Sequence, residues 1–219
     1  MNRTGSMLLW SLVIVCLTGG LPAQADIGIN PRASTLGYGA QLTWGINDSV
    51  SVGVEANRFD KRINDTYGGI NYRYEIDSSS FAVLGHWYPA GRGGVFRLTA
   101  GLYRNDSQVS GTAGLISGSS YTIGNTSYTA ANIGSLTGTA TFDKNAPYLG
   151  IGWGGRPGER FGFTFDLGAM YVGAPKVGLS TTGGVVSAAD LETERQQVEN
   201  DFRNVKWFPL IALGVYVRF

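Results

Sequence analysis

The sequence predicts an all-β fold, an eight-stranded antiparallel transmembrane β-barrel with long extracellular loops. Three observations lead to this prediction: an export signal begins the chain, apolar and polar residues alternate over several segments, and the last of these segments ends on an aromatic residue, Phe219. Strict alternation points every second side chain of a strand to one face, which in a barrel faces lipid, and the others into the lumen.

The N-terminal segment has the three parts of a cleavable export signal. Arg3 supplies the positive charge, residues 7–17 form an apolar run, and an Ala-Gln-Ala cleavage site follows. The run is shorter than the ~20 residues of a membrane-spanning helix, and a Gly-Gly-Leu-Pro breaker comes after it, so an uncleaved anchor is the weaker alternative. We therefore expect a signal peptide at 1–25 and a barrel domain at 26–219.

Composition narrows the function classes. Cys16 lies in the signal, so the mature chain has neither a disulfide nor a thiolate metal ligand. Removing the signal takes one arginine from the 17 basic residues and nothing from the 16 acidic ones, so a basic surface for nucleic acid is not expected. The chain has 33 glycines, roughly twice the usual ~7% share, which suits a crowded barrel interior.

Alternation indicates seven strands directly. In the first of them Tyr38, Leu42 and Trp44 share one face, while glycine, glutamine and threonine share the other. A soluble sandwich also alternates, but its polar face usually carries more Lys, Glu and Thr and less glycine. Counting back from the C-terminus, the predicted strands are 36–45, 49–59, 70–88, 94–104, 146–155, 160–172 and 207–219.

An eighth strand is expected before these seven. Bacterial single-chain barrels have an even number of strands with both ends in the periplasm. Ile27, Ile29 and Ala33 alternate with small or polar residues, so 27–33 is the predicted first strand. Pro31 cannot donate to a strand ladder, and the alternative is that this segment threads the lumen.

The connections fall into short turns and long loops. Turns are expected at 47–48, 90–94 and 156–160, and long extracellular loops at about 60–69, 105–145 and 173–205. The second loop is predicted to hold a hairpin whose strands carry Tyr121 and Tyr128. In the third loop, residues 190–203 lack Gly and Pro, and three apolar residues share one side, which predicts a short helix. Those residues are Leu191, Val198 and Phe202.

The closing segment carries apolar residues at alternate positions to the end of the chain. They are Ile211, Leu213, Val215, Val217 and Phe219. This pattern resembles the signal by which the barrel-assembly machinery recognises outer-membrane proteins, with Val217 where tyrosine is commoner. The assembly machinery is therefore an expected partner during biogenesis.

A wider pattern of glycine and aromatic residues runs through 36–39, 147–154, 165–168 and 206–209. It resembles a family of little-characterised proteobacterial outer-membrane β-barrels, similar in architecture to the transmembrane domain of outer-membrane protein A. The resemblance implies a barrel in the outer membrane, surrounded by lipid and lipopolysaccharide. It implies no reaction and no cofactor.

Four charged residues fall on predicted inward faces in the lower and middle lumen: Arg32, Glu55, Arg97 and Asp166. Charges in a lumen too narrow for bulk water need partners. We therefore expect a neutral, mutually paired cluster that plugs the barrel. The alternative is a gate in which arginine and acid exchange partners to admit small ions.

Enzymatic barrels of the outer membrane use an active-site histidine as a base or an acid. The single histidine here, His86, lies one step from a predicted periplasmic turn, and Trp87 and Tyr88 after it fit the aromatic girdle. A structural, lumen-facing histidine is expected, and we assign no catalytic, cofactor-binding or metal-binding residue.

Three functions follow, in decreasing order of support. The long loops offer polar surface outside the cell, which favours a structural or surface-interaction role with an extracellular ligand that the sequence does not identify. A narrow ion or small-solute channel comes second, because an eight-stranded barrel fills with side chains. A lipid-modifying enzyme comes third.

Overall fold

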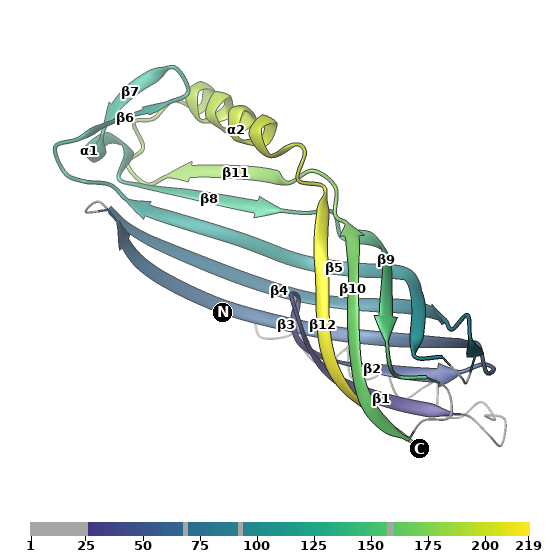
Figure 1. Ribbon diagram of the computed structural model, residues 1–219. Coiled ribbons are helices and arrows are strands. Elements are labelled where there is room, and N and C mark those ends of the chain that lie inside the picture. The colour runs from purple at the N-terminus through teal and green to yellow at the C-terminus, as the bar shows by residue number, and fades with distance from the viewer. Residues whose placement is uncertain (1–25, 68–69, 92–93, 157–159) are drawn as a thin grey trace, which may run out of the picture.

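The computed structural model describes residues 26–67, 70–91, 94–156 and 160–219, and the expected signal peptide lies outside them. Within the described residues, a ring of eight antiparallel strands closes into a barrel, with further strands and two helices gathered at one end (Figure 1). Neither of these helices has the length and apolar character of a membrane span. The eight-stranded prediction is confirmed.

The barrel is closed by pairing between its first and last strands. Each strand pairs antiparallel with the next in the ring, and β12 pairs with β1. In ring order the strands are β1 (Ile27–Ser34), β2 (Gly37–Gly45), β3 (Val50–Tyr67), β4 (Ile70–Trp87), β5 (Phe96–Gly114), β9 (Asn145–Trp153), β10 (Phe161–Tyr171) and β12 (Trp207–Arg218).

The segment with Pro31 is a barrel strand, and the alternative of a lumen-threading segment is wrong. On one side β1 pairs with β2 along its whole length, including Pro31 with Ala40. On the other side, the ladder to β12 has paired positions before and after Asn30 and Pro31 but none at these two described residues. The missing proline N–H thus falls within a gap in the ladder.

Side chains alternate between lipid and lumen as expected. In β12, Ile211 and Leu213 are exposed on the outer surface, whereas Leu210 and Ala212 are buried. Beyond the end of β12, the backbone N–H of Phe219 donates to the carbonyl of Ile27 (2.9 Å), so the last residue of the chain is tied to the first barrel strand.

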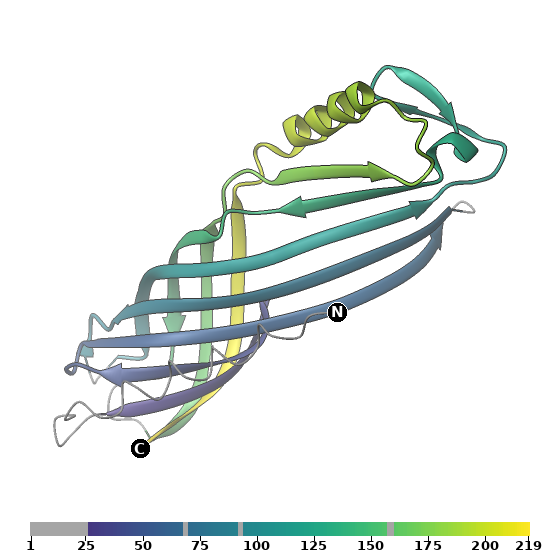
Figure 2. The same ribbon diagram turned by 180° about the vertical axis from the view of Figure 1, so that it is seen from behind.

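Three strands continue well beyond the barrel rim. β3, β4 and β5 contain 18, 18 and 19 residues, whereas a transmembrane strand needs ~10. The expectation of loops from residue 60 and from residue 105 was therefore wrong, because β3, β4 and β5 keep pairing far above the barrel. Figure 2 shows these strands extending past the shorter ones.

The extension forms a folded outer module, which we define as the part of β3–β5 beyond the barrel together with the elements that join it. β8 pairs with β5 and β11 pairs with β8. The expected hairpin is present as β6 and β7, and the expected helix is present as α2. The joining elements are β6 (Ser120–Ile123), β7 (Thr126–Thr129), α1 (Ala130–Ile133), β8 (Ser135–Thr141), β11 (Lys176–Thr181) and α2 (Ala188–Phe202).

Candidate functional site

Four strands bring the charged residues selected from the sequence to one place in the lumen. They come from β1, β3, β5 and β10, and each occupies an inward position of its strand. All four are buried, and the most accessible is only 6% exposed. They are Arg32, Glu55, Arg97 and Asp166.

These side chains form one continuous chain of ion pairs. Nη1 of Arg32 is 2.7 Å from Oε2 of Glu55, and Nη2 of Arg32 is 2.7 Å from Oδ2 of Asp166. The other oxygen of Asp166 is 2.7 Å from Nη2 of Arg97. Arg97 also donates to the carbonyl of Gly154. Two positive and two negative charges alternate along the chain, so the cluster is neutral.

Glu55 has further partners, which were not among the residues selected from the sequence. Asn57 and Tyr103 donate to Oε1 (2.8 and 3.1 Å), and Gln41 lies 3.5 Å from Oε2. Each of these residues occupies an inward position, as alternation predicts. Which polar partner it meets there depends on the register between strands. Because a buried carboxylate needs several hydrogen bonds, these contacts complete the cluster.

Glycine makes room for the ion pairs. A Cβ atom on Gly152 would lie 2.3 Å from Oδ1 of Asp166 and 2.9 Å from Nε of Arg97. A Cβ on Gly168 would lie 2.5 Å from the ring of Tyr148. Real Cβ atoms do not approach this closely, so the glycine-rich inward face is matched to the large side chains opposite.

An apolar layer adds to the filling of the lumen. The rings of Tyr103 and Tyr148 pack edge to face, with centroids 5.5 Å apart and planes at 76°. Leu84, Met170 and Leu210 are buried in the same cluster. These buried side chains fill the part of the lumen that they occupy.

His86 lies lower in the lumen and is held by hydrogen bonds. Its Nδ1 is 2.9 Å from Oγ1 of Thr99, and its Nε2 is 3.3 Å from Nε2 of Gln41. The adjoining cavity, lined in part by His86 and Tyr88, measures about 10 Å³, enough for about one water molecule. Within the described residues, His, Cys, Asp and Glu side chains form no group of three or more that could hold a metal ion.

The outer module has a small core of its own beneath the hairpin. Ile123, Ala130 and Ile133 are buried there, the last of them completely. Long loops were expected in this region, but residues 106–143 fold into strands, a hairpin and a short helix. The module is therefore an ordered structure above the barrel.

Polar contacts attach α2 to the module. Glu194 accepts from the backbone N–H of Gly124 and Glu199 from that of Val177, both at 2.9 Å. Tyr128 donates to Asp190 (2.6 Å). No residue of α2 is buried. The apolar side expected from the sequence therefore contributes less to the attachment of the helix than these polar contacts do.

These contacts favour the charged forms of the helix carboxylates. Hydrogen bonds from Tyr128 and Ser187 lower the pKa of Asp190. The N–H of Val177 and the guanidinium of Arg195 lower the pKa of Glu199.

A closed ring of eight strands, an apolar outer surface and a filled, charge-paired lumen define the class: a transmembrane β-barrel of the outer-membrane type. Two crystal structures share this fold. CarO from Acinetobacter baumannii has a TM-score of 0.59 and 23% identity, covering 89% of this chain and 98% of that one. CarO2 from the same organism has a TM-score of 0.60 and 22% identity, covering 89% and 99%. Neither a protein-family model nor a curated relative matches this chain.

Proposed function

We propose that this protein is a non-conducting outer-membrane anchor whose outer module mediates contacts at the cell surface. The observation that carries the proposal is the combination of a filled lumen with a folded module above it. The ion-pair chain through Arg32 supports the first part. The strands, hairpin and helix of the module support the second.

The filled lumen is the argument against a channel. Opening a path past Arg32 and Asp166 would separate buried opposite charges, which costs several kcal/mol unless water or another charge replaces the partner. The tyrosine and leucine layer would also have to move. The proposed role therefore rests on the module's surface.

The inner face of the module, which continues the lumen-facing side of β3–β5, offers apolar contact surface. Ile63, Tyr74 and Val109 are 39%, 41% and 38% exposed there. Tyr72 stacks on Tyr74, with ring centroids 6.1 Å apart and planes 5° from parallel. Exposed apolar side chains grouped on an ordered surface are typical of interaction sites. We infer that a partner contacts this inner face.

Excising part of the module while keeping the barrel tests the proposal. The backbone N–H of Asn105 donates to the carbonyl oxygen of Lys144 (2.6 Å), and that of Val172 donates to the carbonyl oxygen of Lys206 (2.9 Å). Short Gly-Asn-Gly turns at these two places can therefore replace residues 106–143 and 173–205. Cells displaying the trimmed barrel should adhere to cultured epithelial cells and to one another several-fold less than cells displaying the full chain.

A triple variant tests the inner face without removing the module. Ile63→Ser, Tyr74→Ser and Val109→Ser together should reduce adhesion as the excision does. Gln108→Ser on the opposite face of β5 is the matched control. If cells with equal surface levels of the full chain and the trimmed barrel adhere and aggregate equally, the proposed role is wrong.

A further inference from the structure

The outward side of β3, β4 and β5 changes from apolar to polar at nearly the same level on all three strands. Below this level, outward positions carry apolar side chains such as Val52, Phe81 and Leu102, each exposed on the outer surface. Above it, every outward position is polar: the even residues of 58–66, the odd residues of 71–79 and the even residues of 104–112. Cross-strand register pairs Arg58 with Ser79, and Arg104 pairs with Phe81, so the three changes lie within one outward position of one another. We infer that they mark the outer edge of the hydrocarbon layer.

The inward side of the same strands is mixed at both levels. Below the change it carries Glu55 as well as Leu84, and above it the apolar Ile63 and Val109 stand with polar residues such as Lys61. The outward polar face of the module is continuous with the lipid-facing surface of the barrel. This continuity places it beside the head groups of the outer leaflet.

Most charges on this outward polar face are already neutralised. Arg58 pairs with Asp60 (2.7 Å), and Arg62 pairs with Glu75 (3.4 Å). Such exposed pairs hold little net charge, so the face offers mainly hydrogen-bond donors and acceptors. Arg73, Arg104 and Asp77 make no ion pair with any described residue, and of these Arg73 lies nearest the strand tips. A hydroxyl-rich ligand with some negative charge matches this chemistry.

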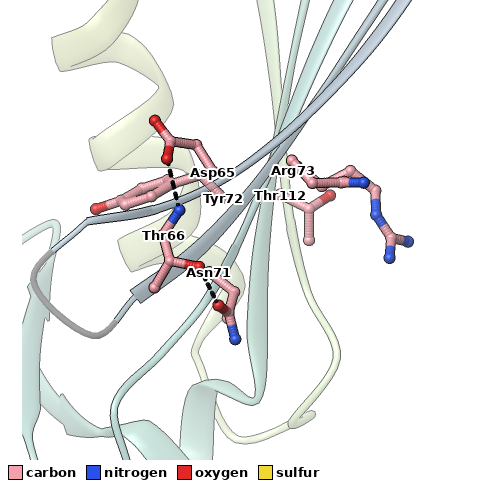
Figure 3. Close-up of a pocket in the computed structure, with 8 residues that line it drawn as sticks. Asp65, Thr66, Asn71, Tyr72, Arg73 and Thr112 are labelled. Carbon is pink, nitrogen blue, oxygen red and sulfur yellow. Dashed lines mark hydrogen bonds between the residues drawn. The ribbon is translucent and has the colours of Figure 1, made fainter.

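A cleft at the strand tips provides a place for such a ligand (Figure 3). Its volume is about 530 Å³, within the ~300–1,000 Å³ range of small-molecule sites. On the outward side Asn64, Arg73 and Thr112 line it and stand in one row across β3, β4 and β5, and at the strand tips the cleft also reaches Asp65 and Tyr72 of the inward side. Thr66 donates to Oδ1 of Asn71 (2.8 Å), which leaves the Asn71 amide N–H groups to serve a ligand.

Gly114 leaves a recess in this cleft. It is paired with Asn71, and a Cβ at Gly114 would lie 3.7 Å from the carbonyl oxygen of Asn71, an ordinary contact. A larger side chain therefore fits the fold but would fill the recess. In Figure 3, Arg73 and Thr112 lie away from Tyr72, on the other side of the sheet.

We propose that the outward polar face of β3–β5 binds the saccharide part of the outer-leaflet glycolipid, with one sugar seated in the cleft beside Asn71, Arg73 and Gly114. Position selects this occupant, because the face continues the lipid-contacting surface upward into the layer where glycolipid sugars lie. The arrangement would fix the module against the membrane and leave its inner face free. The inference rests on the outward orientation of the module, not on its adhesive role.

The test uses the full mature chain in detergent and the delipidated core oligosaccharide of lipopolysaccharide as the probe. Calorimetric titration should show binding to the wild type. The double variant Asn71→Ala/Arg73→Gln should bind about tenfold more weakly, as the loss of hydrogen bonds from an amide and a guanidinium predicts. Gly114→Leu should have a similar effect by filling the recess. Lys61→Gln, on the inward side of β3, is the matched control and should bind like the wild type.

Heat-modifiable gel mobility shows whether each variant has folded, so loss of the fold is not mistaken for loss of the site. Equal affinity of the wild type and both cleft variants would overturn the proposal, as would no binding by the folded wild type. Tighter binding of sialyllactose than of the core oligosaccharide would also overturn it, since the cleft would then serve a host-type glycan. This test measures glycan binding alone, so its result does not depend on the outcome of the adhesion experiments.

Discussion

Arg32 of β1 and Asp166 of β10 meet across the strand that closes the barrel, with Nη2 of Arg32 2.7 Å from Oδ2 of Asp166. β12 lies between their two strands in the ring. The pair thus links the first strand to a strand 134 residues later. Since Asp166 also binds Arg97, one carboxylate pairs with two guanidinium groups in the lumen, and Glu55 supplies the second negative charge.

Asp166→Asn should destabilise the barrel strongly. The substitution keeps the shape of the side chain but leaves Arg32, Arg97 and Glu55 with a net buried positive charge. Removing one partner of a buried ion pair costs about 3–5 kcal/mol. Urea unfolding in lipid vesicles measures the change. Asp60→Asn, whose partner Arg58 is exposed, should unfold like the wild type, and equal stability of both variants would refute the role assigned to the cluster.

Gly152→Ala should also destabilise the barrel, by about 1–3 kcal/mol, because the added methyl group overlaps the Asp166–Arg97 pair. Gly85→Ala is the matched control, since its Cβ would approach no described atom closer than 3.8 Å. The midpoint of urea unfolding should fall for Gly152→Ala only. If the two variants have the same midpoint, the glycine does not make room for the ion pair.

Acid should release α2 from the module. The pKa of Glu199 is lowered by the N–H of Val177 and by Arg195, and Arg195 lowers that of Glu192 from 4.5 to about 2. A lowered pKa stabilises the folded form fully above the ordinary value, and this contribution is lost as pH falls through the folded pKa. The protection factors of the amides in 188–202, which correct for the pH dependence of the intrinsic exchange rate, should therefore stay constant at pH 5 and above and fall between about pH 4 and 2.

Glu199→Gln separates this effect from general acid unfolding. The variant should exchange faster in α2 already at pH 7, while exchange in the barrel strands stays unchanged. Protection factors in α2 that do not change between pH 7 and 2.5 would argue against carboxylate contacts as the attachment.

Much of the barrel follows from alternation, and so does the choice of lumen charges. Period-two patterning fixes which side chains face inward, so Arg32 and Asp166 could be selected without the structure. Their partners could not, because pairing depends on register between strands far apart in sequence. Gln41 and Asn57 were missed as partners of Glu55 for this reason.

The strands of the outer module were harder to predict from the sequence for two physical reasons. Above the membrane the outward residues of β3, such as Asp60 and Arg62, are polar, and inward Lys61 interrupts the apolar side, so the alternation is obscured. β8 consists largely of Ser, Thr and Gly, a composition typical of loops. It is a strand because β5 and β11 supply partners on both sides.

We expect the paired and packed side chains to block the passage of ions through the lumen. Planar-bilayer recording of the purified, folded protein measures this. The wild type should show no conductance steps, and neither should Glu55→Ala, because Asp166 still pairs with Arg32 and the tyrosine layer stays in place. Reproducible single-channel steps in the wild type, changed in size or frequency by Glu55→Ala, would show instead that the lumen conducts and that the ion-pair chain is a gate.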